Sequence, residues 1–338
     1  MVIFETSTRT MSARILTYFL ILLPLLGTSQ FFNKVNWEDN RHQIELGLGT
    51  SNFLGDLGGK DAIGTNDLQD LELSEFRFGF LIGHKYTLYK KLYLRSNFTF
   101  SRVSGNDNLT EESFRRNRNL HFRSNIFELN AMIEYEIPIN FRKGHIYDIK
   151  GVKGWNAKGA SFYVFAGIGG FYFNPKAQID GRWVELRPLR TEGQGLPGGP
   201  KEYSRVSISI PVGVSLSKRI SDLLSMGLEL SYRYTFTDYI DDVSTVYFNP
   251  YDIALYDETG QSDAAAYLSN PALGPQQGGV GSYATAPGQQ RGDETDDDGF
   301  MLLTIKAQYL LKDNGPGRKG ARRKKFKRYK SRSKKVIF

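Results

Sequence analysis

The chain has 338 residues, of which 40% are apolar, 13% aromatic and 24% charged, and it contains no cysteine. The charged fraction is ordinary for a folded protein, so wholesale disorder is excluded. The lack of cysteine excludes disulfide frameworks, thiolate zinc sites and cysteine nucleophiles. The net charge of +8 is confined to one end: from Lys312 onward there are 13 Lys and Arg against Asp313 alone, and the remainder has a net charge of −4.

Residues 1–29 are predicted to be a cleaved signal peptide. Arg9 and Arg14 precede an apolar run over residues 15–26, and small residues follow before Gln30. This order is typical of export signals. The alternative is a membrane anchor, but a helix of this length covers about 18 Å, whereas the hydrocarbon core is ~30 Å thick. We therefore expect an exported chain that is either soluble or a β-barrel, since no later segment has 18 consecutive apolar residues.

Hydrophobic periodicity favours the barrel. Over residues 223–236 apolar and aromatic side chains alternate with Ser, Gly, Glu and Arg. Strict alternation predicts a strand with one apolar and one polar face, here longer than an ordinary globular strand. Similar alternation, or in one case a continuous apolar run, predicts eight strands near residues 44–48, 76–82, 92–100, 127–136, 162–173, 205–217, 223–236 and 301–309.

The polar faces of these strands carry charges of both signs, among small residues. The charged side chains that we expect inside the barrel are Glu45, Arg77, Arg95, Glu128, Glu134, Glu229, Arg233 and Lys306. Opposite charges can pair inside a narrow barrel while the apolar face contacts lipid. The predicted fold class is all-β, an eight-stranded antiparallel transmembrane β-barrel. A soluble β-sandwich, which also alternates, is the alternative.

The connections between the strands predict the orientation. Long connections (51–74, 104–121, 174–204 and 237–299) alternate with shorter ones (85–91, 138–160 and 218–223). Outer-membrane barrels have long extracellular loops and short periplasmic turns. We therefore expect residues 30–311 to form an outer-membrane barrel with long extracellular loops and both termini in the periplasm, and residues 312–338 to form a basic periplasmic C-terminal tail.

No pattern in the sequence predicts catalysis. The four histidines lack metal-ligand spacing, and there is no Gly-x-Ser-x-Gly motif. The acidic run 293–298 lacks the glycine and terminal glutamate of a calcium loop, and is interpreted as a solvated charge run. We expect no enzyme, no cofactor and no metal; a lipid-modifying barrel enzyme is the formal alternative.

Basic residues mark two candidate surfaces for a periplasmic partner, one in the connection 138–160 and one in the tail. They are Arg142, Lys143, Lys150, Lys153, Arg322, Arg323, Lys324, Lys325, Lys327 and Arg328. In a cytoplasmic protein such a tail would indicate nucleic-acid binding, which export argues against. The tail is either solvated or docks to an acidic periplasmic partner, to peptidoglycan or to anionic lipid.

Several local strings support a more specific hypothesis. Residues 47–57 read Gly-Leu-Gly-Thr-Ser-Asn-Phe-Leu-Gly-Asp-Leu, residues 174–177 read Asn-Pro-Lys-Ala, and the segments 188–195 and 237–245 follow later strands. Together they resemble the PorG-type outer-membrane barrels of the type IX (Por) secretion system of Bacteroidetes. The residues that carry the resemblance are Gly55, Asp56, Asn174, Pro175, Lys176, Trp183, Glu192, Gly193, Gln194, Asp238, Asp241 and Asp242.

The resemblance implies a non-enzymatic barrel in outer-membrane lipid that works with the secretion and gliding machinery. Its implied partners are a periplasmic ring lipoprotein and the partner of that lipoprotein, which the barrel anchors or docks to the outer membrane. Other outer-membrane translocon subunits are further candidates. The alternative from a different class is an independent small barrel that acts as an adhesin, receptor or narrow pore.

Overall fold

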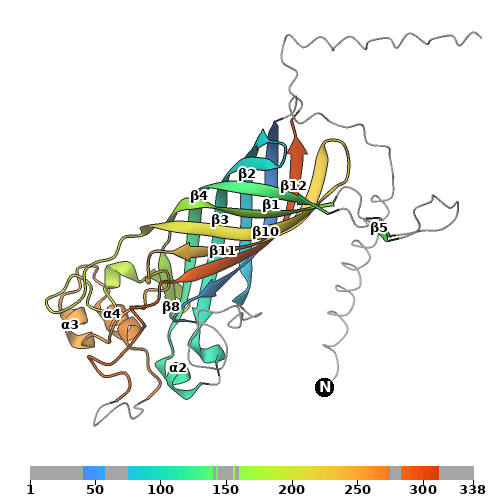
Figure 1. Ribbon diagram of the computed structural model, residues 1–338. Helices are drawn as coiled ribbons and strands as arrows, with labels where there is room; N and C mark the ends of the chain where they lie inside the picture. The colour runs from blue at the N-terminus through green and yellow to red at the C-terminus, as the bar shows by residue number, and fades with distance from the viewer. Residues whose placement is uncertain are drawn as a thin grey trace, which may run out of the picture.

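The computed structural model describes residues 41–57, 75–110, 112–139, 160–274 and 283–311, and the backbone alone of 142–143 and 155–156. Eight long strands dominate it (Figure 1): β1 (His42–Leu54), β2 (Arg77–Tyr89), β3 (Leu92–Asn106), β4 (His121–Pro138), β7 (Ala160–Tyr172), β10 (Val206–Arg219), β11 (Leu224–Thr235) and β12 (Gly299–Leu310). Each pairs antiparallel with its neighbours in this order, and β12 pairs back with β1. The prediction of a closed eight-stranded antiparallel barrel is confirmed.

Glycine allows neighbouring strands of the wall to approach closely, as Gly49 and Gly167 show. A Cβ on Gly49 would lie 2.0 Å from the carbonyl oxygen of Leu303 across the β1–β12 pair. A Cβ on Gly167 would lie 2.2 Å from the carbonyl oxygen of Ala131 across β4–β7. A side chain at either point would push the paired strands apart, because the obstacle is backbone.

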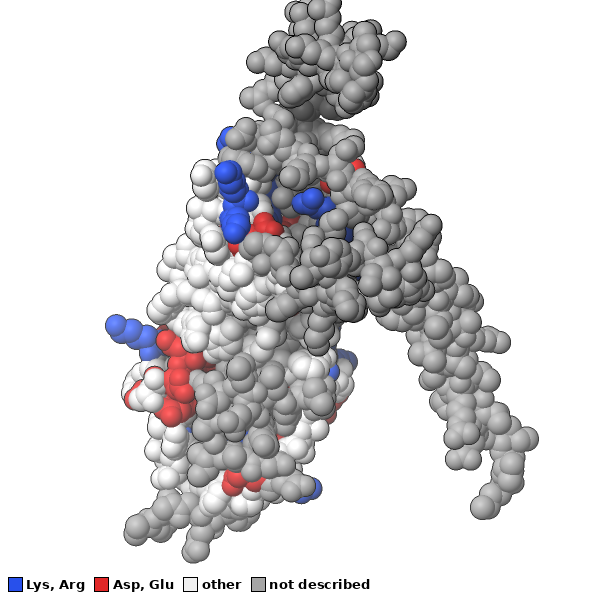
Figure 2. Space-filling view, turned by 45° about the vertical axis from the view of Figure 1, so that its right-hand side comes forward, with Lys and Arg blue, Asp and Glu red and all other residues white. Residues whose placement is uncertain are grey.

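The outer wall is apolar. Along β4 the outward side chains Phe127, Leu129, Ile133 and Tyr135 are 42–67% exposed, while the inward residues 128, 130, 132 and 134 are buried. Aromatic residues ring both edges of this belt: Phe78, Phe127, Tyr172, Tyr234 and Phe236 at one edge, and Tyr89, Tyr135 and Tyr309 at the other. In Figure 2 the visible described wall between the two ends carries no charged side chain.

The long connections fold into a cap at one end of the barrel (Figure 1). It contains the hairpin β8 (Pro175–Ile179) and β9 (Arg182–Glu185), which extends β4. The helices of the cap are α2 (Ser113–Arg118), α3 (Pro250–Leu255) and α4 (Ser262–Ser269), with 3₁₀ turns η4 (Asp107–Leu109) and η5 (Arg187–Leu189). The main buried apolar cluster lies here. It joins residues at strand ends, such as Phe53 of β1, to loop residues such as Phe173 and Ile240. The long connections are therefore folded where they are described.

The opposite end is simpler. Short turns join β2 to β3 and β10 to β11, and the two-residue strands β5 (Arg142–Lys143) and β6 (Trp155–Asn156) pair with each other. The start of β1 and the last described residue meet at this end, where the Leu311 N–H donates to the His42 carbonyl at 2.8 Å. Within the described segments, no helix is both long enough and apolar enough to span a bilayer.

Candidate functional site

The barrel interior holds an ion-pair network of balanced charge. Eight charged side chains are at most 1% exposed there, four acidic and four basic: Glu45, Glu128, Glu134, Glu229, Lys85, Arg95, Arg233 and Lys306. Period-two alternation points them inward from β1, β2, β3, β4, β11 and β12. Buried charges need partners, and equal numbers of each sign provide them.

Arg95 is the centre of this network. Its guanidinium donates to Glu134 at 2.9 Å and to both oxygens of Glu229 at 2.6 and 2.9 Å. Its Nε lies 3.6 Å from the Glu45 carboxylate. Two further cations complete the charge balance, because Lys306 is 2.7 Å from Glu229 and Lys85 bonds Glu134.

A second group lies nearer the cap. Arg233 Nε is 3.3 Å from Glu128, which also accepts from Ser209 at 2.6 Å and from Asn130 at 2.9 Å. These partners come from three different strands, so the side chains brace the barrel from inside. The filled lumen leaves these ion pairs shielded from solvent.

The structure places seven of the eight expected interior charges in the lumen, and Arg77 is the exception. Arg77 begins β2 at the cap end, where its side chain is 38% exposed and donates to Ser104 at 2.7 Å and Glu75 at 2.9 Å. Although β1 and β3 both continue past this point, the Arg77 side chain turns toward Glu75 and Ser104 instead of into the lumen. Conversely, Lys85 is interior although the expected strand ended at residue 82; continuing the alternation from Leu81 would have placed it there.

The residues that carry the family resemblance converge on the cap. Asp56 follows β1, Glu192 follows η5, and Asp241 and Asp242 follow β11. The Asp241 carboxylate accepts from the Leu57 N–H at 3.1 Å, across 184 residues of sequence. The Asp242 carboxylate accepts from the Tyr203 hydroxyl at 2.6 Å and from Thr191. These acids tie three loops together.

Two arginines hold this cluster, the buried Arg291 and the half-buried Arg118, and neither was singled out from the sequence. Arg291 lies 2.9 Å from Glu192 and donates to the Asp242 carbonyl at 2.7 Å. Arg118 donates to the Arg291 carbonyl at 2.7 Å, to the Asp56 carbonyl at 2.9 Å, and to the Asp107 carboxylate at 2.8 Å. α2 positions Arg118 because Glu112 caps its first turn and Asn119, in the left-handed region, ends it.

Burial raises the pKa of several carboxyl groups in the cap. Burial raises the pKa of Asp56 to about 6, against the opposing effects of the Asp293 N–H and Arg118. Burial, with Asp241 and Asp56 nearby, raises the pKa of Asp238 to about 10. Burial also raises the pKa of Asp298 well above its usual range. The acidic run 293–298 is thus not wholly a solvated charge run: Asp298 is 1% exposed and accepts from the Ile240 N–H at 2.8 Å.

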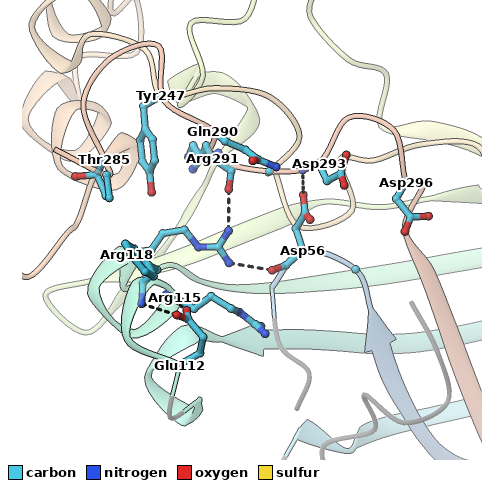
Figure 3. A pocket seen from close by; sticks show the side chains of 14 residues that line it. Asp56, Glu112, Arg115, Arg118, Tyr247, Thr285, Gln290, Arg291, Asp293 and Asp296 are labelled. Atoms are coloured by element: carbon cyan, nitrogen blue, oxygen red, sulfur yellow. Dashed lines mark hydrogen bonds between the residues drawn. The ribbon is translucent and has the colours of Figure 1, made fainter. Parts of the chain in front are cut away.

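A pocket of about 370 Å³ opens beside Arg118 in the cap (Figure 3). Asp56 and Arg291 form one side of it, and α2 with Glu112 and Arg115 forms another. Its lining mixes acids, bases, amides and aromatic rings. Among the described residues, no group of three or more His, Asp or Glu is arranged to hold a metal ion. The mixed lining offers hydrogen-bond donors and acceptors to a polar group.

The remaining resemblance residues have structural positions in or near the cap. Asn174 and Lys176 bond Glu185 across the β8–β9 hairpin at 2.9 and 3.0 Å, and Pro175 begins β8. Trp183 stacks on the Arg123 guanidinium, 3.8 Å from the ring centroid. The loop at residues 192–194 turns at Gly193, whose φ is 70°, and Gln194 accepts from the Glu192 N–H at 3.1 Å.

Several predicted features lie outside the described residues. These are the signal segment 1–29, the tail 312–338 with its basic docking candidates, and Lys150 and Lys153 in the connection 138–160. Arg142 and Lys143 are described only as the backbone of β5. The predicted domain boundaries and periplasmic docking surfaces therefore stay predictions.

A family model described as a domain of unknown function (DUF6089) matches residues 19–184, a little under half of the chain. No curated protein matches the sequence. The structure is similar to neisserial surface protein A, with a TM-score of 0.34 and 9% identity over 80% of this chain and 97% of that one. It is also similar to Ail, the attachment invasion locus protein of Yersinia pestis, with a TM-score of 0.33 and 10% identity over 81% and 99%.

A third similar structure is the N-terminal β-barrel domain of Pseudomonas aeruginosa OprF, with a TM-score of 0.31 and 8% identity over 80% and 99% of the two chains. All three similarities are remote. The assignment of the barrel therefore rests on the strand pairing of this chain, and the assignment of a role rests on its own residues.

Proposed function

We propose that this chain is an outer-membrane β-barrel that acts as a structural, non-enzymatic anchor for a larger assembly. The observation that carries the proposal is the filled lumen, in which eight buried charges pair with one another instead of lining an aqueous path. A closed barrel with an apolar outer wall is suited to a lipid environment, and a lumen in which charged side chains pair across the barrel does not favour a pore.

The dimensions of the wall support the membrane placement. Phe127 and Tyr135 lie eight residues apart on β4, which is about 27 Å along a strand. With the ~40° tilt usual for such barrels, the belt is about 21 Å tall, close to the ~25 Å band of outer-membrane barrels. Aromatic rings at both edges match the girdles that mark the two interfaces.

The finer proposal follows the resemblance to PorG-type barrels. In it, the chain is a component of the type IX secretion and gliding machinery, and docks a periplasmic ring lipoprotein and the partner of that lipoprotein to the outer membrane. It is supported by the motif residues, which are far apart in sequence but lie together in one cluster of the cap: Asp56, Glu192, Asp241 and Asp242. The proposed contact surfaces are the connection 138–160 and the basic tail.

Two experiments test the proposal. Cysteine at Glu258, in the cap, is expected to react with an impermeant reagent on intact cells, whereas cysteine at Asp222, in the β10–β11 turn, is not; the reverse pattern would refute the orientation. Deletion of residues 312–338 is expected to leave the barrel inserted but to lower recovery of periplasmic partners. A control tail of equal length without charge separates the role of charge from that of length. Unchanged recovery would leave the connection 138–160 as the contact.

A second candidate function is favoured by one observation. The described cap is folded and carries the 370 Å³ pocket, as expected of an adhesin or receptor rather than of a passive anchor. Variants of Tyr247 or Gln290, which line the pocket, distinguish the two functions. A receptor would lose ligand or cell binding and keep secretion, whereas an anchor would keep both.

A further inference from the structure

Three arginines gather on one side of the barrel, between the aromatic edge of the wall and the β8–β9 hairpin. Arg77, Arg102 and Arg123 come from the adjacent strands β2, β3 and β4 and line one groove of about 260 Å³ with Trp183 and His121. The acidic residue in this lining is Glu75, which pairs with Arg77. Among the described lining residues, three arginines therefore face one glutamate, and the charge of the described groove is positive.

Arg102 and Arg123 point outward. On β3 the outward series runs Phe98, Phe100, Arg102, and on β4 it runs Phe127, Asn125, Arg123. The register pairs Arg102 with Asn125, whose side-chain oxygen accepts from Arg102 Nε at 2.8 Å. Both arginines are half-buried, so their guanidinium groups are partly removed from water without being enclosed.

Arg102 and Arg123 lie beyond the cap-side edge of the apolar belt. Phe100 and Phe127 are in ring contact, with centroids 5.2 Å apart, at the cap-side edge of the apolar belt. Arg102 follows Phe100 by two residues, about 7 Å along the strand, and Arg123 lies four residues beyond Phe127, about 13 Å. The polar headgroup zone adds roughly 5–8 Å on each side of the hydrocarbon core. With a strand tilt of about 40°, the backbone of Arg102 lies about 5 Å above the edge, within this zone, and that of Arg123 about 10 Å above it. The long side chain of Arg123 can reach back toward the headgroups, as arginine does at membrane interfaces.

Trp183 completes the groove. Its ring lies 3.8 Å from the Arg123 guanidinium and is 38% exposed. A ring stacked on a guanidinium holds the planar fork in one orientation, and an oriented fork binds phosphate oxygens in pairs. Tryptophan itself is favoured at the headgroup level of a membrane.

We propose that this groove binds the phosphate group of a lipid headgroup in the leaflet at the cap end of the barrel, with Arg102 and Arg123 as ligands and Trp183 as the platform that orients Arg123. The inference rests on the membrane placement proposed above and not on the role in secretion. The headgroup is the natural source of phosphate, because the groove opens at the edge of the apolar belt and not within the lumen or the cap.

The test uses Trp183 fluorescence. The chain has three tryptophans, so a Trp37→Phe/Trp155→Phe variant keeps Trp183 as the single reporter. The purified full-length variant is titrated in detergent with diphosphoryl lipid A, with the same lipid after removal of its phosphates, and with inorganic pyrophosphate. We expect a saturable signal with the phosphorylated lipid, and Arg102→Gln/Arg123→Gln in that background to weaken the apparent affinity about tenfold or more, equivalent to about 1.4 kcal/mol. Arg182→Gln, an exposed arginine on the same hairpin, is the matched control and should change the affinity less than twofold.

Each outcome decides the proposal. Equal affinity of the double variant and the parent, or of the phosphorylated and dephosphorylated lipids, would overturn it. Competition by pyrophosphate at the same concentration as the lipid would assign the groove to soluble phosphate and overturn the lipid source. Heat-modified gel mobility checks that the barrel is folded; if the double variant does not fold, Arg123→Gln alone is measured by the same criteria. Failure of the parent to insert into vesicles would refute the membrane placement instead.

Discussion

Replacement of Arg95 by Met tests the interior network most directly. Met is similar in length but uncharged, so the lumen would change from four cations and four anions to three cations and four anions. Glu229 would keep Lys306 at 2.7 Å, and Glu134 would keep Lys85. Glu45 would keep only the amide of Gln308. One buried carboxylate is thus left without a counter-charge.

The expected cost follows from that residual charge. Breaking a buried ion pair by removing one partner costs about 3–5 kcal/mol. Although Arg95 contacts three glutamates, we do not expect three times this loss, because two of them retain a lysine. Arg95→Met is therefore expected to lower the free energy of unfolding by about 3–5 kcal/mol. Urea unfolding in lipid vesicles, followed by heat-modified gel mobility, measures it. Arg219→Met, at the exposed end of β10, should cost less than about 0.5 kcal/mol.

A double variant makes the test sharper. Glu45→Gln in the Arg95→Met background restores three cations and three anions. Glu45→Gln alone should destabilise the barrel, whereas in this background it should recover much of the loss, so the two changes couple strongly. Two results would refute the account of the lumen. One is an unfolding free energy for Arg95→Met within about 1 kcal/mol of the parent. The other is a double variant whose loss of unfolding free energy equals the sum of the losses of the two single variants.

Three further predictions concern the wall and the cap. Leu228→Arg, on the outward face of β11, should cost about 2–4 kcal/mol near the bilayer midplane, measured by urea unfolding in vesicles; a neutral result would contradict the lipid-facing assignment. Arg291→Met should leave Glu192 buried without its partner, so limited proteolysis should cleave the cap faster while the gel mobility of the barrel stays unchanged. Burial raises the folded-state pKa of Asp56 and Asp242 from 3.8 to about 6. Their protonation therefore stabilises the folded cap fully below about pH 4, and this contribution is lost as the pH rises through about 6. The cap should accordingly resist proteolysis better at about pH 4.5 than at about pH 7, and the opposite order would refute this.

The barrel could be predicted from the sequence because its signal is local. Lipid on one side and a narrow lumen on the other impose a period of two on every strand, and each strand carries that pattern alone. The same alternation places Glu45, Glu229 and Lys306 in the lumen. It fails at Arg77, where the strand begins and the side chain turns to its ion-pair partner Glu75 instead of into the lumen. Lys85 was not predicted as an interior residue, because apolar and polar residues no longer alternate clearly in β2 near the turn.

The cap could not be predicted in the same way. Its contacts join residues far apart in sequence, such as Arg118 with Arg291 and Leu57 with Asp241. Loops have no periodic pattern of apolar residues, so the sequence does not predict such contacts. The resemblance motifs indicated where the cap residues lie along the chain but not that they meet. The arginines that hold them, Arg118 and Arg291, lie in segments that look like ordinary polar loop.

The charged lumen has a physical reason beyond stability. An eight-stranded barrel could be filled with apolar side chains, and buried ion pairs are often no more stabilising than such packing. A strand apolar on both faces, however, would be a continuous apolar run. In β4, whose first outward residues are polar, that run would cover residues 126–138. Glu128, Asn130 and Glu134 interrupt that run. Each charge at a central position costs a spanning helix about 2.5–3.5 kcal/mol. The polar interior therefore disfavours a helix in the membrane before the barrel forms, and the ion pairs among the described interior charges make that interior tolerable once the barrel has closed.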